Sequence, residues 1–178
     1  GNVLEFEEKF RQYIDSDSCV AVNSGTAALN LSLSLIDIKN YEVILPSLSF
    51  VSTANAIILN GGKPVFVDVD PNTLNIDPEK IENSISAKTK MILPVHFGGL
   101  PSNLEKIRSL SKKYNLKIVE DAAHAAGASY NTKKIGSHST AICFSFHPVK
   151  NLAMPTGGLI SINNKQHKKF RQLLLARR

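Results

Sequence analysis

A lysine stands just beyond an apolar run in the stretch FSFHPVKN, residues 144–151. Phe144 and Phe146 alternate with Ser145, and a His-Pro pair then breaks the pattern before Lys150. An amine that loses hydration at the edge of an apolar site keeps its lone pair available for a Schiff base with an aldehyde. A strand end followed by a turn would aim Ser145 and Lys150 into one cleft. The alternative interpretation is a loop lysine that reaches into water.

Two consecutive acids follow another apolar run, in VEDAAHAAG at residues 119–127. Because side chains alternate along a strand, only one of Glu120 and Asp121 can face a given site. A carboxylate at a buried strand end needs a cation or an N–H group as its partner. Asp121 as a helix N-cap and His124 as a core histidine remain alternative interpretations.

Residues 23–29, NSGTAAL, form a turn between an apolar strand and a helix that begins at about Thr26. A helix N-terminus presents free N–H groups and a partial positive charge, which suit a phosphate. Gly25 would let the backbone approach such a ligand closely, and the Thr26 hydroxyl would donate to it. Ordinary capping by Ser24 or Thr26 explains the same residues.

Phe50 starts the next helical pattern after a strand, in PSLSFVSTAN at residues 46–55. It is either a core aromatic or a flat face against a planar ligand. Together the four segments indicate one ligand, which is planar and phosphorylated and carries a basic nitrogen and an aldehyde. Pyridoxal 5′-phosphate (PLP) has these properties, and its sites pair a Schiff-base lysine with an acid for the ring nitrogen.

Strand and helix patterns alternate along the chain, and the four segments lie at predicted strand ends. Continuous apolar runs such as VILP and MILPV are typical of strands covered on both faces. We therefore predict an α/β fold of three α/β/α layers, with a mixed, mainly parallel sheet whose last strand runs antiparallel. Ligands bind at the carboxyl ends of the strands in such sheets. The seven predicted strands are 19–23, 42–46, 64–69, 91–97, 117–121, 141–146 and 158–163.

The composition favours an ordinary globular protein. The 178 residues carry a formal net charge of +6, without a basic stripe interleaved with aromatics, so nucleic-acid binding is disfavoured. Cys19 and Cys143 both lie in apolar runs and are predicted to be buried free thiols, without the spacing of metal ligands. No membrane span or signal peptide is apparent, so we expect a cytoplasmic protein.

The motifs NSGTAAL, LPSLSFVSTANAI, VEDAAHAAGA and FSFHPVKN, in this order, resemble the DegT-type (StrS-like) sugar-nucleotide aminotransferases. These are fold-type-I PLP enzymes related in fold to the large domain of aspartate aminotransferase. The resemblance covers nearly the whole chain, and VEDAAHA and FSFHPVKN are its most specific parts. One departure is MPTGG, where relatives commonly carry GEGG, so Thr156 replaces an acid.

By position, the resemblance implies that Lys150 forms the Schiff base and later moves the proton. It implies that Asp121 keeps the pyridine nitrogen protonated, that His124 lies near the ring, and that Asn151 accompanies the lysine. The remaining cofactor-binding positions are Gly25, Thr26, Ala27 and Ser145 at the phosphate and Phe50 against the ring.

The resemblance implies transfer of an amino group from glutamate to a nucleotide-linked keto sugar, in a homodimer with shared active sites. Residues 1–178 would be the PLP-binding large domain, apparently truncated at both ends and without a small C-terminal domain. A PLP-dependent sugar dehydratase of the same family is an alternative activity, although dehydratases replace the lysine or add an iron–sulfur site. A catalytically inactive PLP-fold binding or dimerisation module is also compatible with these motifs, and so is a phosphate-binding domain without PLP.

Overall fold

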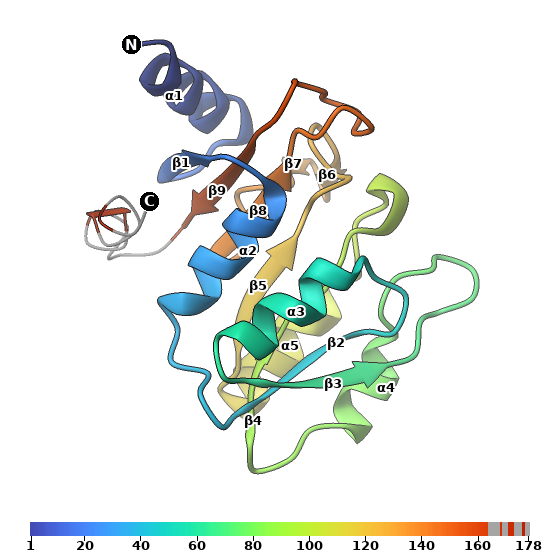
Figure 1. Cartoon of the computed structure of the whole chain (residues 1–178). Coiled ribbons are helices and arrows are strands. Elements are labelled where there is room, and N and C mark those ends of the chain that lie inside the picture. Colours follow the sequence, from blue (N-terminus) through green and yellow to red (C-terminus); the bar gives the residue numbers. More distant parts are fainter. Residues whose placement is uncertain (164–167, 169–170, 173–175, 177–178) are drawn as a thin grey trace.

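The computed structural model describes residues 1–163, 168, 171–172 and 176 (Figure 1). Within them, a mainly parallel sheet has the strand order β1-β9-β8-β5-β4-β2-β3. Among the described strands of this sheet, only β9 runs against its neighbours, since it pairs antiparallel with both β1 and β8. The strands are β1 (Ser18–Val22), β2 (Glu42–Pro46), β3 (Lys63–Val67), β4 (Thr89–Ile92), β5 (Lys117–Asp121), β8 (Ala141–Ser145) and β9 (Gly158–Ile162).

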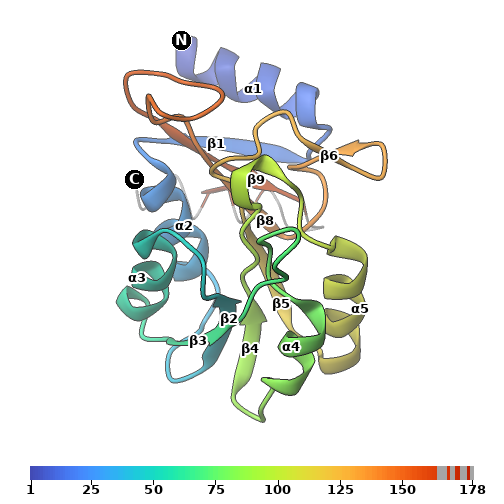
Figure 2. The ribbon, with the colours of Figure 1, turned by 90° about the vertical axis from the view of Figure 1, so that its right-hand side faces the viewer.

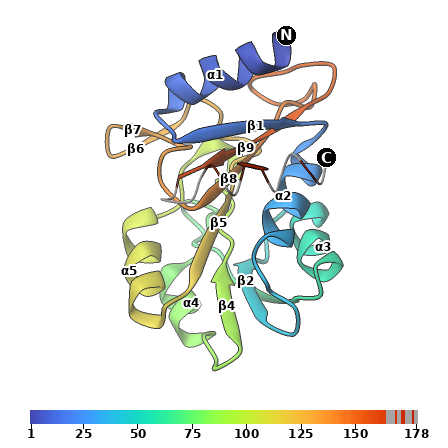
Figure 3. The same ribbon diagram turned by 90° about the vertical axis from the view of Figure 1, so that its left-hand side faces the viewer.

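Helices cover both faces of this sheet, as Figures 2 and 3 show from opposite sides. On one face lie α2 (Gly25–Ser34) and α3 (Val51–Leu59), and on the other lie α4 (Pro78–Asn83) and α5 (Leu104–Tyr114). The N-terminal helix α1 (Asn2–Ile14) packs beside β1. The predicted three-layer α/β/α fold with a mixed, mainly parallel sheet of seven strands is therefore confirmed for the described residues.

Capping residues fix where the helices begin. The Ser24 hydroxyl accepts the backbone N–H of Ala27 at the start of α2. Asp77 caps α4, with proline at its first position, and Asn103 caps α5. Each side-chain oxygen satisfies a backbone donor that the first helical turn leaves free.

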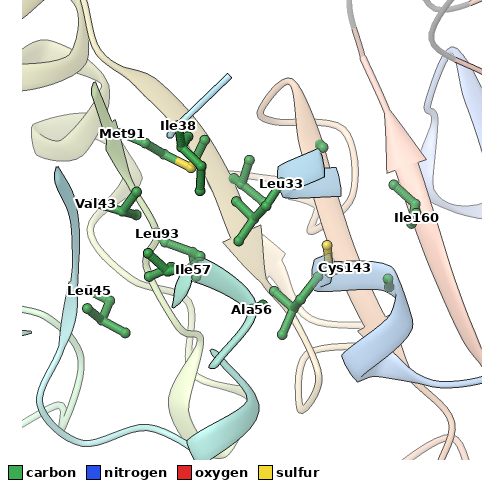
Figure 4. Packing of buried hydrophobic residues seen from close by; sticks show 14 of the residues in the cluster. Leu33, Ile38, Val43, Leu45, Ala56, Ile57, Met91, Leu93, Cys143 and Ile160 are labelled. Atoms are coloured by element: carbon green, nitrogen blue, oxygen red, sulfur yellow. The ribbon is translucent and has the colours of Figure 1, made fainter. Parts of the chain in front are cut away.

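The core consists of separate clusters on the two faces of the sheet. Between the sheet and α2 and α3 lie Leu33, Ile57, Leu93 and Cys143 with other apolar side chains (Figure 4). On the opposite face, Phe10 of α1 packs edge-on against Phe144 at 5.2 Å between ring centroids. The strands are therefore buried on both sides, which explains the continuous apolar runs in their sequences.

The structure differs from the predicted elements in a few places. The strand predicted at 91–97 ends at Ile92. After it, Val95 forms only an isolated bridge to Asp121 before a short 3-10 turn at Phe97–Gly99. A small hairpin of β6 (Ser129–Tyr130) and β7 (Lys133–Lys134) was not predicted. The stretch KKFRQLLLARR at residues 168–178, whose pattern predicts a further helix, lies largely outside the described residues.

Candidate active site

The register of β1, β9 and β8 brings two of the predicted segments together. Gly158 at the start of β9 pairs with Val22 at the end of β1 and with Ser145 at the end of β8. The turn after β1 therefore lies over the end of β8, and a bridge between Ser24 and Gly157 holds it there. Residues more than a hundred positions apart in the sequence become neighbours at this edge.

Gly25 brings the start of α2 close to the end of β8. A Cβ atom placed on Gly25 would lie 2.7 Å from the Ser145 Cβ, a distance that side chains do not reach. Glycine at this position lets the N-terminus of α2 close onto the Ser145 hydroxyl. Free N–H groups, the Thr26 side chain and a hydroxyl then face one cavity, an arrangement that suits a phosphate.

Asp121 ends β5 with its side chain in the same cavity and only 4% exposed. Its Oδ2 accepts a hydrogen bond from the Thr53 hydroxyl at 2.8 Å, and its Oδ1 accepts one from the Ala123 N–H at 3.1 Å. No helix follows Asp121, so the alternative interpretation as a helix N-cap is wrong. The carboxylate is held by two donors and keeps acceptor capacity for a ligand N–H.

Lys150 lies in the loop after β8 and lines the cavity, and its backbone N–H donates to the His147 carbonyl at 2.8 Å. His124 lines the same cavity from the segment after β5. Burial and the positive charge of Lys150 lower the pKa of His124, while Asp121 opposes them. His124 is therefore neutral near pH 7 and adds no charge beside the lysine.

The cavity has a volume of about 280 Å³, near the lower end of the range for small-molecule sites. Phe50, the residue before α3, forms part of its wall and is 73% exposed. It is not a core aromatic, and its ring is available to a planar ligand. The cavity thus combines an anion cradle, an amine, a carboxylate and an aromatic face, which fits PLP.

Two predicted cofactor-binding residues lie outside the cavity lining. The Ala27 N–H already donates to the Ser24 hydroxyl at 3.1 Å, and its side chain lines a groove on the other side of α2. The Asn151 side chain turns away and donates to the Ala126 carbonyl at 2.5 Å. Gly25, Thr26, Phe50, Asp121, His124, Ser145 and Lys150 all line the cavity.

Thr53 is a residue of the site that the sequence did not reveal. It is fully buried on α3, and its N–H donates to the Phe50 carbonyl at 3.0 Å. The first turn of α3 therefore connects the aromatic wall to the carboxylate. A threonine on the buried side of a helix gives no sequence signal for this contact, because the contact depends on how α3 packs against β5.

Two further predictions concern residues outside the cavity: that the cysteines are buried free thiols, and that no membrane span is apparent. Cys19 and Cys143 are buried free thiols, as predicted. Burial raises the pKa of Cys19 to about 11 and raises the pKa of Cys143 further. Both are therefore protonated at neutral pH and take no nucleophilic part. None of the described helices has the length and apolar character needed to cross a bilayer.

The fold is that of the PLP-dependent aminotransferases, since solved aminotransferase structures match it with TM-scores of 0.90 to 0.93. The cavity lies at the carboxyl edge of the sheet. Residues 1–176 match the model of the DegT/DnrJ/EryC1/StrS aminotransferase family. The chain belongs to this family.

Proteins of known sequence or structure are similar to this chain. The uncharacterized protein MJ1066 of Methanocaldococcus jannaschii is 44% identical over 164 residues, which make up 92% of this chain and 42% of that protein. The structure of S. venezuelae DesV in complex with a ketimine intermediate is 35% identical, with a TM-score of 0.91 over 97% of this chain and 47% of DesV.

The structure of NtdA from Bacillus subtilis with its bound cofactor PMP is also 35% identical. Its TM-score is 0.89 over 96% of this chain and 39% of NtdA. The chain thus spans less than half the length of these relatives.

Proposed function

We propose that this chain is the PLP-binding large domain, residues 1–178, of an aminotransferase. The observation that carries the proposal is the convergence of Lys150, Asp121 and the N-terminus of α2 on one cavity of about 280 Å³. A loop lysine and a phosphate-binding turn occur in many proteins, but their meeting with a buried carboxylate is typical of sites for this cofactor. Family membership and the PMP-bound structure of NtdA support the cofactor assignment.

Each residue has a distinct task in the proposed site. The N-terminus of α2 and the Ser145 hydroxyl bind the phosphate, and Phe50 and His124 lie against the ring. The Asp121 carboxylate accepts a hydrogen bond from the ring nitrogen. Two donors fix its orientation, so little reorganisation is needed when the ligand enters.

Lys150 performs the chemistry. Its Nζ would hold the cofactor at the aldehyde carbon and, once an amino donor takes its place, would carry the proton from the donor's α-carbon to that same cofactor carbon. PLP, when bound, supplies a ring that accepts the electron pair left by that proton. A neutral His124 beside Lys150 adds no positive charge that would hinder proton uptake by the amine.

For substrates we propose glutamate as amino donor and a nucleotide-linked keto sugar as acceptor. This assignment rests on the resemblance of VEDAAHA and FSFHPVKN to sugar-nucleotide aminotransferases. Lys150 in the cavity disfavours the dehydratase alternative, which replaces the lysine or requires an iron–sulfur site. Product analysis with a panel of nucleotide keto sugars separates amination from dehydration.

A homodimer with shared active sites is part of the proposal. Phe50 and Val149 line the cavity, Val51 follows Phe50, and all three side chains are between 62% and 77% exposed. Large apolar side chains gathered beside a site mark a surface that another chain covers. A cytoplasmic location remains a prediction of the sequence.

The experiment that tests the function is the Lys150→Ala variant of the purified protein. The wild-type protein should bind PLP, and borohydride should fix the cofactor to Lys150, detected as a mass increase on the peptide that contains it. Glutamate should convert the bound cofactor and change its absorbance. Lys150→Ala should lose both responses.

The matched control is Lys90→Ala, which removes another half-buried lysine that lies over the Tyr41 ring, 4.7 Å from its centroid. It should retain both responses. Full transaminase turnover in Lys150→Ala would contradict the assignment. PLP binding by the wild type without any response to glutamate would favour the inactive module, and no PLP binding would favour the simple phosphate-binding domain.

A further inference from the structure

A buried polar cluster lies on the side of β5 that faces away from the cavity. It consists of His96, Glu120 and Ser139, of which His96 and Glu120 are 0% exposed and Ser139 is 8% exposed. The His96 Nε2 lies 2.9 Å from the Glu120 Oε2, and the Ser139 hydroxyl donates to the Glu120 Oε1. The proposed cofactor contacts do not use any of the three residues.

The hydrogen bonds determine where the His96 proton lies. The Ser102 N–H donates to the His96 Nδ1 at 3.1 Å, so Nδ1 must present a lone pair. The ring proton is therefore on Nε2, and it points at Glu120. Both oxygens of Glu120 receive a donor, and this arrangement stabilises a carboxylate anion.

The cluster shares its backbone with Asp121. The Asp121 N–H donates to the Pro94 carbonyl at 2.9 Å, and its carbonyl accepts the His96 N–H at 3.0 Å. Asp121 is thus clamped by the segment that carries His96. The next residue, Phe97, lines the cavity and meets the His124 ring edge-on at 6.2 Å between centroids. A shift of His96 would therefore move both Asp121 and Phe97, which line the cavity.

The elements that pack around Glu120 place other charged and titratable groups near it. Burial by itself raises the pKa of Glu120, but hydrogen bonding to His96 and Ser139 and the nearby His138 outweigh it, so that pKa is lowered. Arg108 of α5 donates to the His138 carbonyl at 3.3 Å, and buried Cys143 lies on β8. Asp121 is the neighbouring carboxylate on the cavity side.

We propose that Glu120 is a positioning residue for the cofactor's ring nitrogen, acting through the backbone of β5 and through its negative charge. Its bond with His96 holds Asp121 at the correct position, and its buried charge adds to the negative potential at the end of β5. A protonated ring nitrogen is favoured by both effects. This inference rests on the proposed function, because it concerns the same cofactor.

The test is Glu120→Gln in the purified protein loaded with PLP. Glutamine keeps the size and can still accept the His96 N–H, but it removes the charge. The pH midpoint of the absorbance change of bound PLP should fall by about half a unit or more, and PLP should bind about tenfold more weakly. An unchanged midpoint would overturn the electrostatic role even if the protein were less stable.

Ser139→Ala is the second variant, and it keeps the charge of Glu120 at neutral pH. Its absorbance midpoint should equal that of the wild type. Because the carboxylate loses a donor, PLP should be released in acid at a higher pH than from the wild type. Equal acid release from Ser139→Ala and wild type would overturn the proposal, and this variant decides the outcome if Glu120→Gln does not fold.

Ser161→Ala is the matched control, since Ser161 is a fully buried serine that donates to the Gly136 carbonyl at 2.5 Å, on β9. It should alter neither the midpoint nor the acid release. A shift in this control equal to that in Glu120→Gln would show a general stability effect and overturn the inference. A wild-type protein that binds no PLP would instead overturn the proposed function itself, which distinguishes the two failures.

Discussion

Glu120 and Asp121 are consecutive carboxylates on β5, yet they face opposite sides of the sheet and have different surroundings. Glu120 is fully enclosed, and both its oxygens are occupied by His96 and Ser139. Asp121 has donors on both oxygens too, from Thr53 and Ala123, but its side chain also borders the cavity. Of these two carboxylates, only that of Asp121 can accept a hydrogen bond from a ligand.

Glu120 and Asp121 illustrate two different roles of a buried carboxylate. A carboxylate that is completely enclosed by protein donors stabilises one arrangement of the chain, and its loss leaves donors without acceptors. A carboxylate at a cavity wall is oriented by hydrogen bonds from the protein and keeps acceptor capacity for a ligand. Substitutions on the Asp121 side should therefore alter cofactor chemistry, whereas those on the Glu120 side should also alter the free energy of unfolding.

The largest expected effect is on the Asp121 side. Asp121→Asn should reduce kcat by about 10²–10³-fold, because the amide cannot stabilise the protonated ring nitrogen. Transaminase assays with glutamate measure the loss, and the thermal midpoint should change little. Asp68→Asn alters an exposed aspartate bonded to Lys80 and serves as the control, with activity unchanged. Equal activity of Asp121→Asn and wild type would remove Asp121 from the mechanism.

The next effect is on the Glu120 side. His96→Ala should lower the free energy of unfolding by about 3 kcal/mol, because a buried carboxylate loses a donor and a cavity forms. Denaturant titration of the protein measures it. His147→Ala, which removes an exposed histidine at the cavity rim, should leave stability nearly unchanged. If the two variants were equally stable, the buried cluster would not contribute to folding as proposed.

A smaller effect is expected at the contact between α3 and Asp121. Thr53→Val keeps the shape but removes the hydroxyl, so PLP should bind roughly fivefold more weakly, which corresponds to about 1 kcal/mol. Thr53→Ser should restore most of the affinity, as measured by fluorescence titration. Thr89→Val, which removes another buried hydroxyl that accepts the Ser86 N–H, should not affect affinity. No difference between Thr53→Val and Thr53→Ser would mean that the hydroxyl does not matter.

The smallest effect concerns His124. Burial and the charge of Lys150 lower its pKa in the folded protein below the ordinary value of about 6.5. The unfolded chain therefore takes up the proton first as pH falls, so this contribution to stability is present above about pH 6.5 and is lost on acidification. Thermal midpoints measured between pH 7 and pH 5 should fall less steeply for His124→Gln than for the wild type. Parallel curves would contradict this account.

Local sequence patterns were sufficient to predict much of the fold. The strands predicted at 42–46 and 117–121 match β2 and β5 over their whole length. Asp77, a residue type that favours the N-cap, and Pro78 at the first helical position begin α4. These signals are local, since strand burial, capping and proline geometry depend on neighbouring residues. The end of β4 was placed too late, because the apolar residues Leu93, Pro94 and Val95 follow it, although only an isolated bridge of Val95 to Asp121 continues the pairing.

Part of the candidate site was also predicted from local sequence patterns. Asp121 ends a strand, and Gly25, Phe50 and Lys150 each follow one. The strands of such a sheet place their carboxyl ends at one edge. The sequence could not assign the roles of Thr53 and His96. Their contacts depend on the packing of α3 and of the segment after β4, which no spacing in the sequence encodes.

The sequence by itself determined the α/β class, the strand ends that carry the chemistry and the family resemblance, because these follow from residue type and periodicity. Only the tertiary structure decided which of the two neighbouring carboxylates faces the cavity, and that Ala27 and Asn151 turn away from it. Because side chains alternate along a strand, Glu120 and Asp121 must point to opposite faces of the sheet. Which face becomes the site depends on the helices that pack there.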